Sequence, residues 1–361
     1  MYTINMISKA DSVKGQGVGS AYLEQVALVK EELNDRFFVT VNGKKISNIM
    51  HYHTINFRFV FTIPFAKVMG TAVGYVHFLP ETLDESIHLP KIIKNIFYWY
   101  VIQFYKSMDL LVTVNPCFID KLEAHGIDRR KITYIPNYVS QKDFYPIENC
   151  DKFQLKEKYG LAPDKFTVLT VGQLQIRKGI MEFIGLAKKM PDVQFVWAGD
   201  FSFGKISDGY EKIKHIRANP PSNVTFLGFV EREHMNELYN MADVMFLPSY
   251  NELFPMTVLE SMNCGIPILL RDLELYKDIL FDFYLKGNEN KDFNHILRKL
   301  QREPDFYQKA KDMSFRGGAF YCREHVAQMW SRFYRKAVCY KKKFGKNSKY
   351  VKQAASQKHV K

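Results

Sequence analysis

The chain has 361 residues, 47% hydrophobic and 25% charged, a composition typical of a globular protein of two domains and not of a disordered or membrane-embedded chain. Its formal net charge is +13, and residues 341–361 hold eight lysines and no acidic residue. The longest unbroken apolar run, residues 96–102, is far shorter than the roughly 20 residues needed to span a bilayer.

Neither the first residues nor the cysteines indicate an exported protein. The opening MYTINMISKAD has no basic segment followed by an apolar stretch and a small-residue cleavage site. The five cysteines are scattered without a CxxC spacing, so we expect reduced thiols, no disulfide framework and no structural zinc site. These features predict a cytoplasmic protein.

Residues 1–145 have the pattern of a doubly wound α/β domain. An apolar strand at residues 3–7 is followed by the glycine turn KGQGVGS and then by a helix whose apolar face runs from Tyr22 to Leu33. Further strands are predicted at residues 74–78 and 110–115. The pattern is lost near residues 137–146, where two prolines indicate a linker.

A second α/β pattern covers residues 146–325. Apolar strands separated by helix-length segments are predicted at residues 166–171, 193–198, 224–227, 244–247 and 266–270. Continuous apolar strands alternating with helices indicate a parallel sheet covered on both faces. Two such Rossmann-like domains in tandem would face a cleft, with the loops at the carboxyl ends of their strands reaching into it.

The C-terminal residues follow the last strand. Residues 326–340 predict a helix that can cross back onto the first domain. The basic tail, residues 341–361, has too few apolar residues to pack, which predicts disorder. Such a tail attracts anionic lipid or nucleic acid, and a tail that is merely solvated explains its composition equally well.

The segment PSYNELFPMTVLESMNCGIPILL, from Pro248, is the strongest indication of function. Glu252 lies in a loop after an apolar strand, and Glu260 lies eight residues later in an expected helix. These carboxylates can bracket a ligand that has hydroxyls at both ends, as a nucleotide sugar does; a solvated loop and helix face is the alternative. The amides at the helix start suit a diphosphate, and we expect it to bind at Phe254, Pro255, Met256 and Thr257.

This segment resembles the E-x7-E signature of the retaining, two-Rossmann-domain (GT-B) glycosyltransferases of family 4. The resemblance implies that Glu252 contacts the donor hexose and that Glu260 binds the ribose hydroxyls. It also implies a UDP-sugar as substrate, with no cofactor and no metal ion.

The segment VGQLQIRKG, residues 171–179, is a strand followed by a turn that carries cations. A positive charge there would stabilise a diphosphate leaving group, and the resemblance assigns this role to Lys178. The family usually has arginine where this chain has Gln173, so one fixed charge is missing, and Arg177 is a candidate to replace it. Taken alone, a basic turn after a strand is more often solvated surface.

The resemblance implies further contacts with the donor. Gly17, in the glycine turn, would approach the diphosphate, although such turns also occur in α/β proteins that bind no phosphate. His77, at the end of a strand, would help to hold the hexose, with a core histidine as the alternative. Val230, in GFVEREHM, would lie beside the nucleobase, and Asn137 would shape the turn between the domains.

Two segments of the first domain, INFRFVFTIPFAKVMG and LPKIIKNIFYWYVIQFYK, are unusually aromatic and basic. The second has apolar residues at helical spacing, with Lys91 and Lys94 near Trp99. Trp, Tyr and Lys are typical of an interfacial helix, and a buried helix explains the spacing equally well. His51 and His53, at the end of another expected strand, are candidates for an acceptor pocket, with a structural role as the better supported alternative.

The first domain, including HYHTINFRF, YVHFLPETLDESIHLP and VNPCFIDKL, resembles the Gram-positive diglycosyl-diacylglycerol synthases that make the glycolipid anchor of lipoteichoic acid. This implies transfer of glucose or galactose from a UDP-sugar to monoglucosyl-diacylglycerol, keeping the α configuration. It further implies peripheral contact with the anionic inner face of the cell membrane, and no nucleic acid partner. A family 4 enzyme acting on another cell-envelope or soluble glycan is the first alternative.

Two functions of other classes fit the sequence less well. A nicotinamide-dependent oxidoreductase normally has a full GxGxxG and an acidic residue about 20 positions later, whereas GQGVGS lacks the third glycine. A basic binding protein without activity would explain the charge but not residues 252–267.

Overall fold

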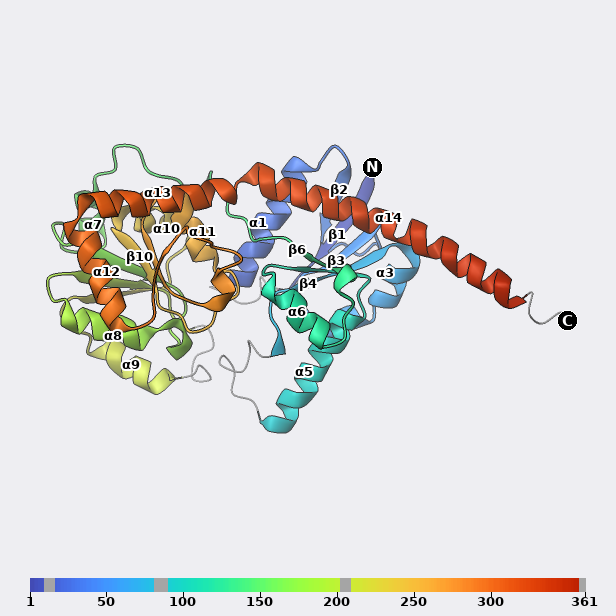
Figure 1. The fold of residues 1–361 in the computed structure, drawn as a ribbon, viewed down its shortest axis with the longest axis horizontal. Helices are drawn as coiled ribbons and strands as arrows, with labels where there is room; N and C mark the ends of the chain where they lie inside the picture. The colour runs from blue at the N-terminus through green and yellow to red at the C-terminus, as the bar shows by residue number, and fades with distance from the viewer. Residues whose placement is uncertain (10–16, 81–89, 202–208, 357–361) are drawn as a thin grey trace.

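The computed structural model describes residues 1–9, 17–80, 90–201 and 209–356, and of residues 341–356 only the backbone. In these residues the chain forms two six-stranded sheets in which all neighbouring strands are parallel. The sheets lie side by side with helices packed around each, and two long C-terminal helices run along the molecule (Figure 1). The expected pair of parallel α/β domains is therefore confirmed.

The first sheet has the strand order β2-β1-β3-β4-β5-β6. Its strands are β1 (Tyr2–Ile7), β2 (Phe37–Val41), β3 (Ile49–Tyr52), β4 (Thr71–Val76), β5 (Leu110–Thr113) and β6 (Ile132–Tyr134). The inner strands β3, β4 and β5 are buried along their whole length, as expected of a sheet covered on both faces. Its helices are α1 (Gly17–Glu32), α2 (Phe57–Val60), α3 (Ile63–Met69), α5 (Lys91–Lys106) and α6 (Cys117–Ala124).

The second sheet has the order β12-β11-β10-β7-β8-β9. Its strands are β7 (Thr167–Val171), β8 (Gln194–Ala198), β9 (Val224–Gly228), β10 (Val244–Leu247), β11 (Ile268–Arg271) and β12 (Leu285–Gly287). The helices around it are α7 (Lys152–Lys158), α8 (Ile180–Lys189), α9 (Tyr210–Ala218), α10 (Arg232–Met241), α11 (Met256–Cys264), α12 (Asn290–Arg302) and α13 (Pro304–Phe320). The switch from the first sheet to the second falls between β6 and β7.

The two domains share one packed core. The same apolar cluster contains Ile4 of the first sheet, Leu169 of the second and Trp330 of the last helix, α14 (Arg323–Ser356). Separate clusters fill the opposite faces of the two sheets, one with residues of α3, α5 and α6 and the other with residues of α8 and α12. The domains are thus joined by buried apolar surface as well as by the chain.

Helix α14 binds back onto the first domain along its N-terminal half (Figure 1). The hydroxyl of Tyr334 accepts a hydrogen bond from Gln25 Nε2 at 3.1 Å, and the hydroxyl of Thr71 donates to the carbonyl of Ala337 at 2.8 Å. The Trp330 ring stacks on Tyr334 with centroids 5.3 Å apart. Polar and aromatic contacts together hold the helix on β3 and β4.

The tail differs from the expectation of disorder. Helix α14 continues through residues 341–356, and residues 357–361 lie outside the described part of the chain. A helix that is already nucleated by packing extends at little further cost, which composition alone does not reveal. No helix in the described residues combines the length and apolar content needed to cross a bilayer.

The packing of α14 yields a stability prediction. We expect Trp330→Ala to lower the free energy of unfolding by about 3–5 kcal/mol, because a fully buried indole leaves a cavity between α14 and the sheet. Chemical denaturation followed by circular dichroism measures it. Gln328→Ala, at an exposed position on the same helix, is the matched control and should change stability by less than about 0.5 kcal/mol. Equal effects of the two variants would contradict the docking of α14.

Candidate active site

A buried ion pair lies where β7 and β10 end. Lys178 belongs to the short 3-10 turn η3 (Ile176–Lys178) after β7, and Glu252 lies in the loop between β10 and α11. The Lys178 ammonium donates a hydrogen bond to Glu252 Oε1. Only 13% and 8% of the two side chains are exposed. The fold therefore brings together one residue from each of the two segments, residues 171–179 and the segment from Pro248, that the sequence analysis identified separately.

The surroundings keep Glu252 ionised. Burial acts to raise its pKa, but the positive charges of Lys178 and Arg177 outweigh burial and hold the pKa below its ordinary value. Arg177 also braces the loop, because its Nη1 donates to the carbonyl of Asn251 at 3.1 Å. The carboxylate of Glu252 and the loop that carries it are thus held in place by Lys178 and Arg177.

Gly179 allows the two loops to approach closely. Its φ of 79° lies in the left-handed region, and a Cβ there would come within 2.5 Å of the Pro248 carbonyl oxygen. No other residue fits this position without moving the backbone of one loop. Gly179 thereby sets the separation of Lys178 and Glu252.

Two asparagines that precede the second domain in the chain form hydrogen bonds to the next part of this loop. Asn115, at the end of β5, donates to the Leu253 carbonyl at 3.0 Å, and Asn137 donates to the Phe254 carbonyl at 3.0 Å. Sequence analysis did not identify Asn115, because nothing local indicates which distant carbonyl it reaches. These bonds fix the loop that leads into α11.

Helix α11 begins directly after this loop. Pro255 is its N-cap, and the first-turn N–H groups of the helix receive no capping side chain from the described residues. Met256 and Phe254 are buried, and Thr257 Oγ1 is buried without a hydrogen-bond partner in the described structure. The expected diphosphate site at this helix start stays a prediction.

Glu260 lies on α11 beside α10. Its Oε2 accepts a hydrogen bond from the Tyr239 hydroxyl at 2.5 Å, and its Oε1 accepts from Arg232 Nη1 at 3.3 Å. Val230 is half-buried in the segment that leads into Arg232, the first residue of α10. Sequence analysis did not identify Arg232 or Tyr239 as neighbours of Glu260.

The candidate residues His51, His53 and His77 form a buried row of rings. His77, just after β4, stacks on Tyr75 with centroids 4.2 Å apart, and its Nε2 has no hydrogen-bond partner among the described residues. Burial lowers the pKa of His77 to about 3, so the ring is neutral at physiological pH. His53 packs against Tyr75, and His51 contacts the Tyr334 hydroxyl at 2.9 Å under α14. His51 and His53 therefore lie in the core of the first domain.

The remaining candidates are spread over the structure. Gly17 is the first residue of α1, whereas Gly15 lies outside the described residues. Gln173 is half-buried between β7 and η3. Gln175 is buried nearby with both side-chain polar atoms unpaired in the described structure, which sequence analysis did not anticipate. The membrane candidates Lys91, Lys94 and Trp99 all lie on α5.

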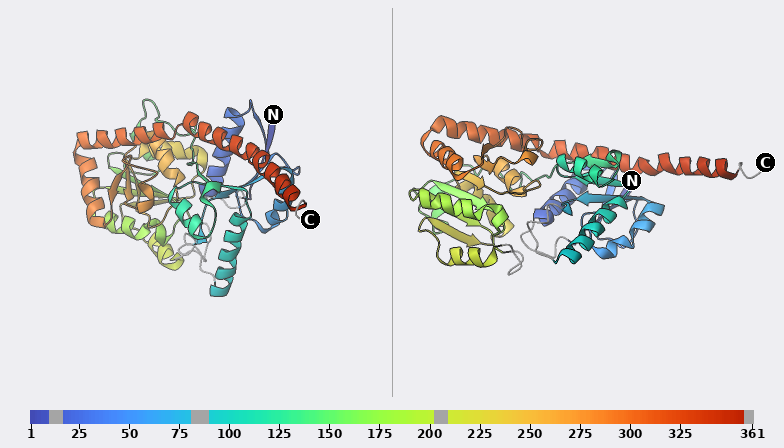
Figure 2. Two further views of the ribbon diagram at one scale, coloured as in Figure 1. Left: turned by 45° about the vertical axis from the view of Figure 1, so that its right-hand side comes forward. Right: turned by 60° about the horizontal axis from the view of Figure 1, so that its bottom comes forward.

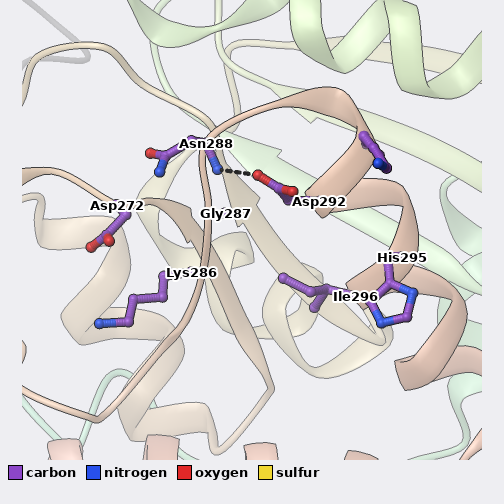
Figure 3. A pocket seen from close by; sticks show the side chains of 8 residues that line it. Asp272, Lys286, Gly287, Asn288, Asp292, His295 and Ile296 are labelled. Carbon is purple, nitrogen blue, oxygen red and sulfur yellow. Dashed lines mark hydrogen bonds between the residues drawn. The ribbon is translucent and has the colours of Figure 1, made fainter.

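A surface depression lies at the ends of β11 and β12 (Figure 3). Its described lining consists of Asp272, Lys286, Gly287, Asn288, Lys291, Asp292, His295 and Ile296. The Asn288 N–H donates to Asp292 Oδ2 at 3.0 Å. The Glu289 N–H donates to the same oxygen at 3.1 Å, which forms part of the capping box at the start of α12. None of the residues identified from the sequence lines it.

The described residues offer no cluster of side chains for a metal ion. Among the described residues, no group of three or more His, Cys, Asp or Glu side chains is arranged to hold a metal ion. That the reaction needs no metal and no cofactor stays a prediction.

Known proteins place the chain in a family. The sequence profile described as "Glycosyl transferases group 1" matches residues 151–315. The chain is 44% identical over 337 residues to the alpha-galactosylglucosyldiacylglycerol synthase of Streptococcus pneumoniae, covering 92% of this chain and 89% of that protein. The chain belongs to the group 1 glycosyltransferases. This glycosyltransferase is also 27% identical to the processive diacylglycerol alpha-glucosyltransferase of Acholeplasma laidlawii, over 82% of this chain and 86% of that protein.

The fold of this glycosyltransferase agrees with solved structures. The Anabaena protein HepE, in complex with UDP-glucose, superposes with a TM-score of 0.74 at 14% identity, covering 93% of this chain and 100% of that one. At such low identity the likeness establishes the fold alone. The GT-B arrangement of two Rossmann-like domains is therefore confirmed.

The contact at Gly179 yields a prediction that separates backbone strain from a steric clash. Gly160→Ala should cost about 1–2 kcal/mol of stability, because its φ is +68° and a Cβ there meets nothing within 4 Å. Gly179→Ala adds the clash with Pro248, so we expect a larger loss of stability together with loss of glycosyl transfer. Denaturation and transfer assays of both variants measure this. Full transfer by Gly179→Ala would show that the loop spacing is unimportant.

Proposed function

We propose that this glycosyltransferase moves glucose or galactose from a UDP-sugar to a membrane glycolipid, monoglucosyl-diacylglycerol, and keeps the α configuration. The names of its relatives support the acceptor, since one is a synthase of alpha-galactosylglucosyldiacylglycerol and another glycosylates diacylglycerol. The UDP-glucose bound to the similarly folded HepE supports the donor class. The location would be the cytoplasmic face of the cell membrane.

The buried Lys178–Glu252 pair next to the start of α11 carries the proposal. When the bond between hexose and phosphate breaks, negative charge develops on the diphosphate. The Lys178 ammonium and the first-turn amides of α11 would stabilise that charge in a site shielded from water. Glu252 would accept hydrogen bonds from hexose hydroxyls while it holds Lys178 in place.

Two other groups complete the proposed donor site. The neutral ring of His77 can offer a hydrogen bond to the hexose without adding a charge that would repel the developing cation at the sugar. Glu260 would accept hydrogen bonds from the ribose hydroxyls, for which its two oxygens have spare lone pairs. Gln173 supplies no charge to the diphosphate, so Arg177 would assist Lys178.

The pair can be tested with a substitution that keeps its shape. Glu252→Gln removes the charge and leaves the Lys178 ammonium buried without its counter-ion. We expect transfer to fall about 100-fold or more. The assay is mass analysis of the lipid product from UDP-glucose and from UDP-galactose on monoglucosyl-diacylglycerol.

Glu237→Gln is the matched control, because Glu237 forms an ion pair with Lys158 on the surface of the same domain and should affect transfer little. Wild-type transfer by Glu252→Gln would refute the site. Transfer by the wild type to a soluble glycan but to no lipid would refute the acceptor.

We propose further that the first domain contacts the membrane. The C-terminal half of α5 is buried, with Phe104 and Tyr105 in the core, whereas its N-terminal half projects from the domain (Figures 1 and 2). The large apolar side chains exposed on residues 91–99 of α5 and on residues 57–69, which include α2 and α3, form what we call the apolar surface. Its members are Phe57, Phe61, Phe65, Val68, Met69, Ile92, Ile93, Ile96 and Trp99.

The segment that leads into α2 contacts α5 through Tyr100, the neighbour of Trp99 in the chain. Tyr100 of α5 donates from its hydroxyl to the Ile55 carbonyl at 2.5 Å, and its ring lies 6.1 Å from that of Phe57. Lys91 and Lys94 lie on the same projecting half of α5 and would face anionic headgroups. From the sequence, α5 could be either a buried helix or an interfacial one. In the structure its C-terminal half is buried, and its exposed N-terminal half suits an interface.

Vesicle binding tests the apolar surface. We expect Ile96→Asp to lower partitioning onto phosphatidylglycerol vesicles about tenfold or more, since an apolar side chain no longer enters the headgroup layer. Phe153→Asp on α7 is the matched control, because Phe153 is 58% exposed and Ile96 62% exposed. Equal binding of the two variants in a sedimentation assay would exclude the apolar surface as the membrane contact.

A further inference from the structure

An arginine between the two domains is shared by a carboxylate from each. Arg232, at the start of α10, donates from Nη2 to Oε1 of Glu24, which lies on α1 of the first domain. Its Nη1 donates to Glu260 Oε1 at 3.3 Å. The guanidinium also lies over the ring of Phe144, 4.8 Å from the centroid. One cation therefore links α1 to the α11 carboxylate.

Both carboxylates are deeply buried, with only 6% and 7% of the side chains of Glu24 and Glu260 exposed. Glu24 Oε2 accepts a further hydrogen bond from the Ser140 N–H at 3.1 Å. Asp143 approaches Arg232 Nη2 to 3.9 Å but is 55% exposed. The single charge of Arg232 is thus divided between two buried carboxylates and one solvated neighbour.

This charge imbalance affects the pKa of Glu24. Burial raises its pKa to about 7, an effect that the charge of Arg232 only partly offsets, and the nearby charges of Asp143 and Glu260 act in the same direction as burial. Burial likewise raises the pKa of Glu260. Two carboxylates held this close to one arginine are typical of a functional site more than of a stabilising surface pair.

We propose that Glu24 is a positioning residue for the ribose of the donor, acting through Arg232 on Glu260. The inference rests on the proposed function, because it takes Glu260 as the ribose contact. Glu24 draws the guanidinium toward the first domain, so Arg232 holds Glu260 through one oxygen only. Each Glu260 oxygen then keeps a lone pair for a ribose hydroxyl.

Loss of Glu24 would let Arg232 turn fully onto Glu260. A bidentate arginine–carboxylate pair takes one lone pair on each oxygen. Because the Tyr239 hydroxyl already donates to Oε2, that oxygen would have no lone pair left, and the ribose would lose one of its two acceptors. The ribose site is consequently completed across the domain interface, and donor binding depends on the contact between Glu24 of α1 and Arg232 of α10.

The test compares two nucleotides that differ only at the ribose. Binding of UDP and of 2',3'-dideoxy-UDP, which lacks both ribose hydroxyls, to the full chain is measured by calorimetry. For Glu24→Gln we expect the Kd for UDP to rise about tenfold, the value of one charge-assisted hydrogen bond, and the Kd for 2',3'-dideoxy-UDP to change less than about twofold. A merely structural role of Glu24 would weaken both nucleotides equally.

Two further variants keep the test decisive. Glu24→Asp retains the buried charge but is one methylene too short for the contact with Arg232, so it should show the same selective loss if Glu24→Gln folds poorly. Asp143→Asn changes the exposed neighbour of Arg232 and should leave both affinities unchanged.

The outcomes separate this inference from the function on which it rests. Glu24 variants that bind both nucleotides like the wild type, or that lose both equally, overturn the role of Glu24. The role of Glu24 is also overturned if the wild-type protein binds the two nucleotides with equal affinity. Transfer from a UDP-hexose by the same protein would leave the proposed function intact. Wild-type protein that neither binds UDP nor uses a UDP-hexose overturns the proposed function itself.

Discussion

The buried pair of Lys178 and Glu252 is the constraint around which the second domain is arranged. Neither charge could be buried alone without a cost of several kcal/mol, so the loops that carry them must come together and stay together. Gly179 permits that approach, because a side chain at this position would strike the backbone of Pro248. The loops after β7 and β10 therefore behave as one unit.

The first domain takes part in this arrangement through polar contacts at the edge of the shared core. Asn115 reaches the loop beyond Glu252, and Glu24 reaches the arginine beside Glu260. The apolar contact lies elsewhere, where α14 covers β3 and β4 and the row of histidines. The shared apolar core thus joins the domains, and the hydrogen bonds of Asn115 and Glu24 connect the first domain to a loop and an arginine of the second.

The same domain that supplies these contacts also presents the exposed half of α5. The apolar side chains there are exposed in the described structure, and Lys91 and Lys94 lie beside them on the helix. A lipid acceptor stays at the membrane surface, so an enzyme for such an acceptor gains from a surface that binds there. Membrane contact would explain why the exposed half of α5 is apolar, which core packing does not explain.

Several features followed from the sequence alone. Continuous apolar strands alternating with helices identified two parallel α/β domains, and the spacing of Glu252 and Glu260 around an expected helix start identified the segment that lies beside Lys178. These signals are local, because burial on both faces of a strand and the start of a helix depend on residues that are close together in the sequence. The short edge strands β2, β6 and β12 were not identified, and each is only partly buried in the structure.

Only the tertiary structure decided the rest. It divided α5 into a buried half and an exposed half, continued α14 past residue 340, and brought Asn115, Arg232 and Glu24 to the site. The physical reason is that burial and charge pairing depend on which segments meet. Glu24 and Arg232 are separated by more than half of the chain. The sequence pattern around either residue therefore does not indicate that it contacts the other.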